Sequence, residues 1–184
     1  MTITVTPQDI LDFWYTPPMS DHWFNSNTEI DQTIKSLYKD TWQQAADGEL
    51  DNWKNSAEGC LALCIVLDQF PLNMFRNDPL AFSTEQQAVE ITKHAVAQDF
   101  GKQLPTEKIS FLYMPLMHSE SMADQDESIR LFDEAGLGGN AKFARHHRGI
   151  VERYGRFPHR NQILGRESTE AELDYLASGE AFTG

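Results

Sequence analysis

The chain has 184 residues, of which 40% are hydrophobic, and its 28 acidic side chains outnumber 15 basic ones to give a net charge of −13. This length supports one hydrophobic core, so we expect a single domain over residues 1–184. The negative charge opposes approach to nucleic acid and to anionic membranes. The longest apolar run, residues 60–67, is far shorter than the roughly 20 residues that cross a bilayer. Because no secretory signal is visible either, we expect a cytoplasmic protein.

Three helices are predicted in the first part of the chain. Thr6 is followed by Pro7, a pair that is typical of a helix N-terminus. Asn27 is expected to cap the second helix, and Gly48 to end it. The third helix runs through the apolar residues near position 65. We expect it to end before Pro71, because proline lacks an amide hydrogen and clashes with the preceding turn.

Helical signals continue along the rest of the chain. Residues 83–86 read Ser-Thr-Glu-Gln, a capping-box pattern that opens a fourth helix closing near Gly101. Further helices are expected from about Thr106, Ser121, Asn140 and Ser168, and Pro115 predicts a kink or an early end in the first of them. Capping signals and helical stripes cover most of the chain, whereas alternating strand patterns do not. We therefore predict an all-α fold, a tetratricopeptide-like antiparallel helical array in one domain.

The two cysteines, Cys60 and Cys64, are one helical turn apart in the apolar run. A metal or redox pair favours two-residue spacing and polar neighbours, so we interpret both as core thiols. His118 and Glu120 are two residues apart and do not share a helix face, which disfavours a metal site there as well. We expect no metal and no cofactor.

The most informative segment is residues 142–166, which we call the basic segment. It holds seven of the fifteen basic side chains, six of them arginine, and a single acid, Glu152. Because the planar fork of arginine recognises carboxylate or phosphate, this segment should face something negative. Three alternatives remain open. They are internal salt bridges to acids such as Asp68 and Glu120, a pocket for a small anionic ligand, and a surface for RNA or an acidic partner protein.

Within the basic segment, His147 and the residues after Pro158 have patterns that predict their environment. His147 follows the helical spacing of Ile150 and is interpreted as a histidine at the edge of the core. Pro158 predicts a short helix whose N-terminus holds His159, Arg160 and Asn161, where free N–H groups attract anions.

Two other segments are dense in polar residues. Asp68 follows the most apolar helix, where an acid opposes the helix dipole, so we expect it to be ionised and paired with an arginine. In residues 118–126, Ser119 or Ser121 is expected to cap the next helix, with Asp124 in its first turn.

Four stretches carry a family resemblance: ILDFWY (10–15), LDQFPLNMFRNDPLAF (67–82), FLYMPLMHSESMADQ (111–125) and RYGRFPHRNQILGRES (153–168). They resemble the bacterial family catalogued as domain of unknown function 924 over nearly the whole chain. The resemblance implies an all-helical fold related to tetratricopeptide-repeat proteins and implies no established activity. The family pattern would have Arg and Glu where this chain has Leu72 and Met117, so a pocket that depended on those charges is altered here.

Our leading hypothesis is a helical binding module that holds a small anionic ligand or an acidic peptide in an Arg/His-rich polar cleft. The expected ligand-binding residues come from all three polar segments: Asp68, Asn73, Arg76, His118, Arg153, Arg156, His159, Arg160 and Asn161. The alternative is a hydrolase of a phosphorylated or carboxylated metabolite, with His118 or His159 as general base and Glu120 or Asp68 as its orienting group. No nucleophile motif or phosphate-loop glycine pattern supports catalysis. Nucleic acid is the third and least favoured partner, and the oligomeric state stays open.

Overall fold

The computed structural model describes residues 4–181, and within that range every regular element is a helix. The predicted all-α fold is confirmed. The chain forms two compact units. The first contains the chain up to Arg76 together with Leu80–Pro115, and the second contains Asn77–Pro79 together with the chain from Leu116 onward. The single-domain organisation stays a prediction.

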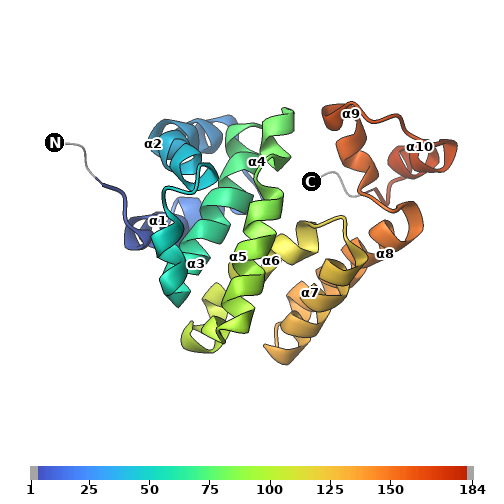
Figure 1. Cartoon of the computed structure of the whole chain (residues 1–184). Coiled ribbons are helices and arrows are strands. Elements are labelled where there is room, and N and C mark those ends of the chain that lie inside the picture. Colours follow the sequence, from blue (N-terminus) through green and yellow to red (C-terminus); the bar gives the residue numbers. More distant parts are fainter. Residues whose placement is uncertain (1–3, 182–184) are drawn as a thin grey trace. The chain divides into compact units, whose positions relative to one another are not determined.

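The first unit is built around α3, whose residues are buried on nearly every side. α3 packs against α1 and α5, and α2 packs against α4 (Figure 1). In chain order the elements are α1 Pro7–Tyr15, η1 Met19–Asp21, α2 Thr28–Ala46, η2 Asp51–Asn55, α3 Ala57–Cys64, η3 Ile65–Gln69, α4 Phe70–Met74, η4 Pro79–Phe82, α5 Glu85–Ala97, η5 Phe100–Gln103 and α6 Thr106–His118.

Pro71 does not end the third helix, and that prediction is wrong. Ile65–Gln69 forms a π-helical turn, in which the Phe70 amide donates to the Ile65 carbonyl five residues back, and α4 continues through Pro71. In an α-helix, the carbonyl of Leu67 would bond the amide that Pro71 lacks. It instead accepts a 2.6 Å hydrogen bond from the Thr84 hydroxyl. A side chain distant in sequence thus satisfies the acceptor that proline leaves open.

The predicted helix caps are confirmed in two cases and wrong in one. Thr6 and Asn27 accept hydrogen bonds from amides in the first turns of α1 and α2. The capping box at residues 83–86 does not form. Thr84 is the N-cap residue of α5 but makes no capping hydrogen bond; its hydroxyl instead donates to the Leu67 carbonyl and accepts from the Trp42 indole. The helix itself is confirmed.

Pro115 also leaves its helix intact, because α6 continues past it to His118. The early end that we considered at Pro115 is therefore not observed. Close by, the Leu112 carbonyl accepts a 2.8 Å hydrogen bond from the Thr92 hydroxyl of α5. The thiol of Cys64 lies 3.6 Å from that hydroxyl and is fully buried, and burial raises its pKa. These contacts agree with its interpretation as a core thiol.

The second unit begins with a helical hairpin. Its elements are α7 Met122–Glu134, α8 Gly138–Tyr154, η6 Pro158–Arg160, α9 Asn161–Leu164 and α10 Glu170–Ala177. α7 and α8 lie side by side and antiparallel (Figure 1), with ion pairs from Arg145 to Asp133 and from Arg148 to Asp126 joining them. Ile150, Val151 and Phe157 form an apolar cluster of this unit with Met122, Tyr154 and Tyr175.

Candidate functional site

Two predicted ligand-binding residues, Asn73 and Arg76, meet at a carboxylate of the first unit. Asp31, in the first turn of α2, accepts hydrogen bonds from Arg76 Nε (2.8 Å), Asn73 Nδ2 (2.8 Å) and Ser26 Oγ (2.7 Å). Burial alone would raise the pKa of Asp31, but these hydrogen bonds outweigh it and hold the pKa below its ordinary value. Asn73 and Arg76 thus fix the C-terminal end of α4 to the start of α2.

Asp68 lies in the π-helical turn of the same unit and is only 5% exposed. The amide of Gln69 donates a 2.7 Å hydrogen bond to its carboxylate and also contacts the sulfur of Met114 at 3.5 Å. Hydrogen bonds of this kind offset the high cost of burying a carboxylate. The pairing of Asp68 with an arginine stays a prediction.

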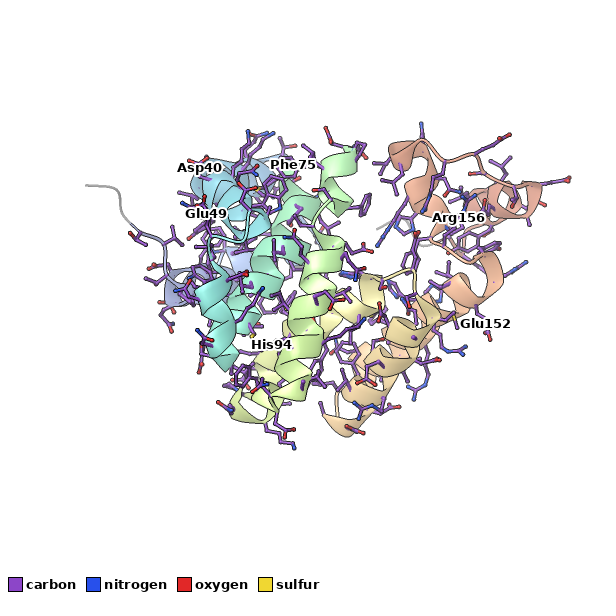
Figure 2. The ribbon with its side chains drawn as sticks, in the orientation of Figure 1. Asp40, Glu49, Phe75, His94, Glu152 and Arg156 are labelled. Atoms are coloured by element: carbon purple, nitrogen blue, oxygen red, sulfur yellow. The ribbon has the colours of Figure 1, made fainter. Side chains whose placement is uncertain are left out.

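In the second unit, Arg156 and Asn161 bind a buried carboxylate of α10. Glu172 is 2% exposed and accepts hydrogen bonds from Arg156 Nε (2.8 Å), Arg156 Nη2 (2.9 Å), Asn161 Nδ2 (3.3 Å) and the Thr169 amide (2.8 Å). The hydrogen bonds from Arg156 lower the pKa of Glu172 to about 2. Figure 2 labels Arg156 beyond the end of α8 and Glu152 in the last turn of that helix. Arg156 therefore anchors α10 to the chain that follows α8.

A second arginine of the basic segment, Arg166, binds Glu120 in the turn after α6. Arg166 donates to both carboxylate oxygens of Glu120, at 2.8 and 2.9 Å, and the Phe157 amide donates to the same group at 2.8 Å. Burial alone would raise the pKa of Glu120, but the Arg166 and Phe157 hydrogen bonds lower it below its ordinary value. An internal salt bridge to Glu120, one of our three alternatives for the basic segment, is therefore present.

Two histidines and an arginine, His147, His159 and Arg160, gather around the ring of Phe157, and together with His118 beside them we call them the His–Arg cluster. The guanidinium carbon of Arg160 lies 4.8 Å from the ring centre, and the rings of His147 and His159 lie 5.7 and 5.8 Å from it. Arg160 Nη2 donates to the His118 carbonyl at 2.7 Å, and the His118 ring is 6.3 Å from that of His147. Arg160 and His147 are buried, whereas His118 and His159 are partly exposed.

Two of these imidazoles are neutral at pH 7. Burial lowers the pKa of His147 to about 4, and burial together with the positive charge of Arg160 lowers the pKa of His159 to about 4. The interpretation of His147 as a core histidine agrees with its 3% exposure and with the 2.8 Å contact of its Nδ1 to the Phe143 carbonyl. The cluster thus combines one fixed cation with two imidazoles that offer neutral N–H or N groups.

The turn that carries His118 is held by buried polar side chains. Gln125 Nε2 donates to the carbonyls of Met117 and Ser119, both at 2.7 Å. The Ser119 hydroxyl donates to the buried Asp124 carboxylate at 2.7 Å and accepts from the Ser121 amide. Ser121 is the N-cap residue of α7, as predicted, but its own side chain makes no capping hydrogen bond.

The turn after α6 and the chain after α8, which carry the His–Arg cluster and its supports, lie in two of the stretches that carried the family resemblance, 111–125 and 153–168. A family model described as "Bacterial protein of unknown function (DUF924)" matches residues 10–180. This chain belongs to the DUF924 family. A protein of unknown function from Agrobacterium tumefaciens, whose structure has been solved, is 38% identical to it, and the two folds superpose with a TM-score of 0.88 over 94% of this chain and 97% of the other. No curated protein matches the chain.

In this DUF924 protein, both departures from the expected family pattern fall on helices. Leu72 is half-buried in α4, and Met117 is 6% exposed in the last turn of α6. Both positions therefore contribute apolar surface where the pattern would have placed charge.

Sequence reasoning missed the two carboxylates that organise the predicted site residues. Glu172 binds Arg156 and Asn161, and its one sequence signal is a capping box with Thr169, which does form. Asp31 binds Asn73 and Arg76, and nothing in its local sequence distinguishes it from other acids in a first helical turn. Arg153 stands apart from the His–Arg cluster: it is exposed on α8, with its guanidinium 5.1 Å from the ring centre of Tyr154.

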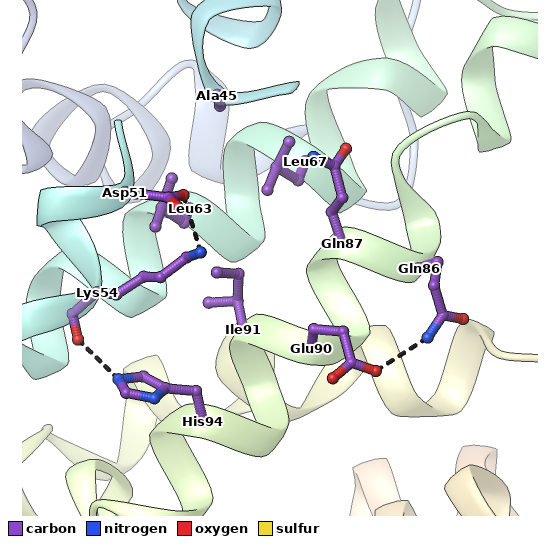
Figure 3. A pocket seen from close by; sticks show the side chains of 10 residues that line it. All are labelled: Ala45, Asp51, Lys54, Leu63, Leu67, Gln86, Gln87, Glu90, Ile91 and His94. Atoms are coloured by element: carbon purple, nitrogen blue, oxygen red, sulfur yellow. Dashed lines mark hydrogen bonds and ion pairs between the residues drawn. The ribbon is translucent and has the colours of Figure 1, made fainter. Parts of the chain in front are cut away.

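A shallow cavity of about 280 Å³ lies in the first unit, with an apolar floor and a polar rim (Figure 3). The rim groups bind one another or nearby carbonyls. Lys54 pairs with Asp51 at 2.8 Å, Gln86 donates to Glu90 at 3.0 Å, and the ring of His94 contacts the Lys54 carbonyl at 3.0 Å. Its polar groups are thus committed to the protein, and we assign it no ligand.

Within residues 4–181, no group of three or more His, Cys, Asp or Glu side chains is arranged to hold a metal ion. Over the same residues, no helix combines the length and apolar character that a membrane crossing requires.

Proposed function

We propose that this protein is a helical binding module that holds a small anionic ligand, with carboxylate or phosphate chemistry, at the His–Arg cluster of its second unit. The supporting observation is the buried guanidinium of Arg160, which is 6% exposed and lies among imidazoles of which two are partly open to solvent. A positive charge in such a low-dielectric position attracts an anion far more strongly than a solvated one does. His118 and His159 supply N–H donors at the accessible edge.

The proposal narrows the set of residues that would touch the ligand. Arg156 and Asn161 act as supports because their donors hold Glu172, and Asn73 and Arg76 do the same for Asp31. We propose that His118, His159 and Arg160 contact the ligand, because they lie together in the His–Arg cluster.

The hydrolase alternative has less support from the geometry. An efficient general base has a pKa near the working pH, whereas burial sets the pKa of His159 at about 4. Its imidazole is neutral at pH 7 but a weak base, which suits hydrogen bonding to a ligand better than proton abstraction.

Thermal unfolding in different salts tests the proposal. Phosphate or sulfate should raise the melting temperature more than chloride at matched ionic strength, because a ligand that binds the folded state adds RT ln(1 + [L]/Kd) to its stability. His159→Ala and Arg160→Lys should each remove that increment, since one removes a donor and the other the planar fork. Arg145→Lys, an exposed change on α8, is the matched control and should keep it. A parent protein that responds equally to all three anions would refute the proposal.

A further inference from the structure

The outward face of α8 carries a row of exposed residues that the His–Arg cluster does not use. Lys142, His146, Gly149 and Arg153 are all exposed, and their spacing of four, three and four residues places them on one side of the helix. We call this row the α8 stripe. It belongs to the second unit alone.

The two cations of the stripe differ from their neighbours in what they bind. Arg145 and Arg148, on the adjoining faces of α8, pair with Asp133 and Asp126. Lys142 and Arg153, by contrast, have no ion-pair partner among the described residues, and Arg153 contacts only the Tyr154 ring. Their charge is available to another molecule.

The stripe also has a gap at its centre. A Cβ added at Gly149 would meet nothing within 4 Å, so the α8 backbone is open to solvent there. Lys142 lies about 10 Å from this gap along the helix axis, and Arg153 lies about 6 Å from it on the other side, at ~1.5 Å per residue. Phe143, 61% exposed, flanks the same stretch and offers apolar surface. A second helix can approach closely at a glycine, because no side chain holds it away.

We propose that the α8 stripe docks an acidic helical segment of a partner protein, which crosses α8 at Gly149 and sets its carboxylates against Lys142 and Arg153. A polypeptide fits better than nucleic acid. Two cations on either side of a gap match a few carboxylates on one helix, whereas nucleic acid is bound through many phosphate contacts. At physiological salt the Debye length is about 8 Å, so the distant acids are screened while direct contacts on the stripe persist.

The test uses a labelled helical peptide of Glu and Ala, compared with a Gln and Ala peptide of the same length, in fluorescence anisotropy at physiological ionic strength. We expect the acidic peptide alone to bind. The double variant K142E/R153E should weaken binding by about tenfold or more, since each reversal replaces an attraction with a repulsion. Lys39→Glu is a matched control, because Lys39 is exposed on α2 of the first unit and also lacks an ion-pair partner among the described residues. It should leave the affinity within about twofold.

A bulky residue at the crossing point gives a test that does not alter charge. Gly149→Leu should also weaken binding by about tenfold or more, while circular dichroism confirms that α8 still forms. Equal weakening by Lys39→Glu and by Arg153→Glu alone, two single reversals that change the net charge by the same amount, would overturn the proposal, because it would mean that only net charge matters. A single-stranded DNA of matched charge that binds as tightly, with the same sensitivity to K142E/R153E, would overturn it in favour of nucleic acid.

Discussion

Thr84→Val removes one hydroxyl from the core of the first unit and leaves two buried polar groups without a partner. The Thr84 hydroxyl donates to the Leu67 carbonyl at 2.6 Å and accepts from Trp42 Nε1 at 3.1 Å. Leu67 is 3% exposed and Trp42 is 5% exposed, so water does not replace either bond. A buried group left unsatisfied costs about 1–3 kcal/mol, which gives about 2–6 kcal/mol for the pair.

Urea unfolding measures this cost as a lower midpoint at an unchanged slope. Thr84→Ser is the control, because it keeps the hydroxyl and loses one methyl group, worth about 1 kcal/mol. In a Trp42→Phe background, Thr84→Val should cost about 1–3 kcal/mol less, since the indole donor is already gone. If Thr84→Val were no more destabilising than Thr84→Ser, the hydroxyl would not satisfy the carbonyl beside Pro71, and our account of how the helix passes through that proline would fail.

Three further predictions follow from other contacts. His147 has a folded-state pKa of about 4 against an ordinary 6.5. Its contribution to the free energy of unfolding should therefore be fully present above pH 6.5 and should be lost as the pH falls toward 4, a loss of about 3 kcal/mol. In urea titrations His147→Gln should weaken this dependence of stability on pH. Glu172→Gln should lower the urea midpoint at pH 7, because it removes the carboxylate that four donors share, whereas Glu170→Gln in the exposed first turn of α10 should not; equal midpoints would contradict the anchoring role. Gly101→Ala should destabilise the first unit, because the new methyl would lie 2.1 Å from the Tyr113 hydroxyl oxygen, and Tyr113→Phe should recover part of the loss in calorimetry.

The candidate site shows where sequence reasoning stops. The basic segment was recognisable as a surface that binds anionic groups, and the structure places Glu120 and Glu172 against its arginines. That Glu172 would be the partner of Arg156 did not follow from the sequence, because Arg156 lies in the loop after α8 and Glu172 lies in α10. The choice among the many carboxylates of an acidic chain depends on which one the fold brings within about 3 Å.

The sequence by itself determined the all-α fold, most helix starts and the core position of the cysteines and of His147. These features depend on local chemistry, since a capping side chain or an apolar stripe acts within a few residues of itself. Tertiary structure decided the passage of the helix through Pro71, the use of Thr84 as a bridge instead of a cap, and the division of the arginines between buried carboxylates and the open α8 stripe. Each of these depends on a partner far away in sequence, and a local pattern contains no information about which distant group will satisfy a carbonyl or a charge.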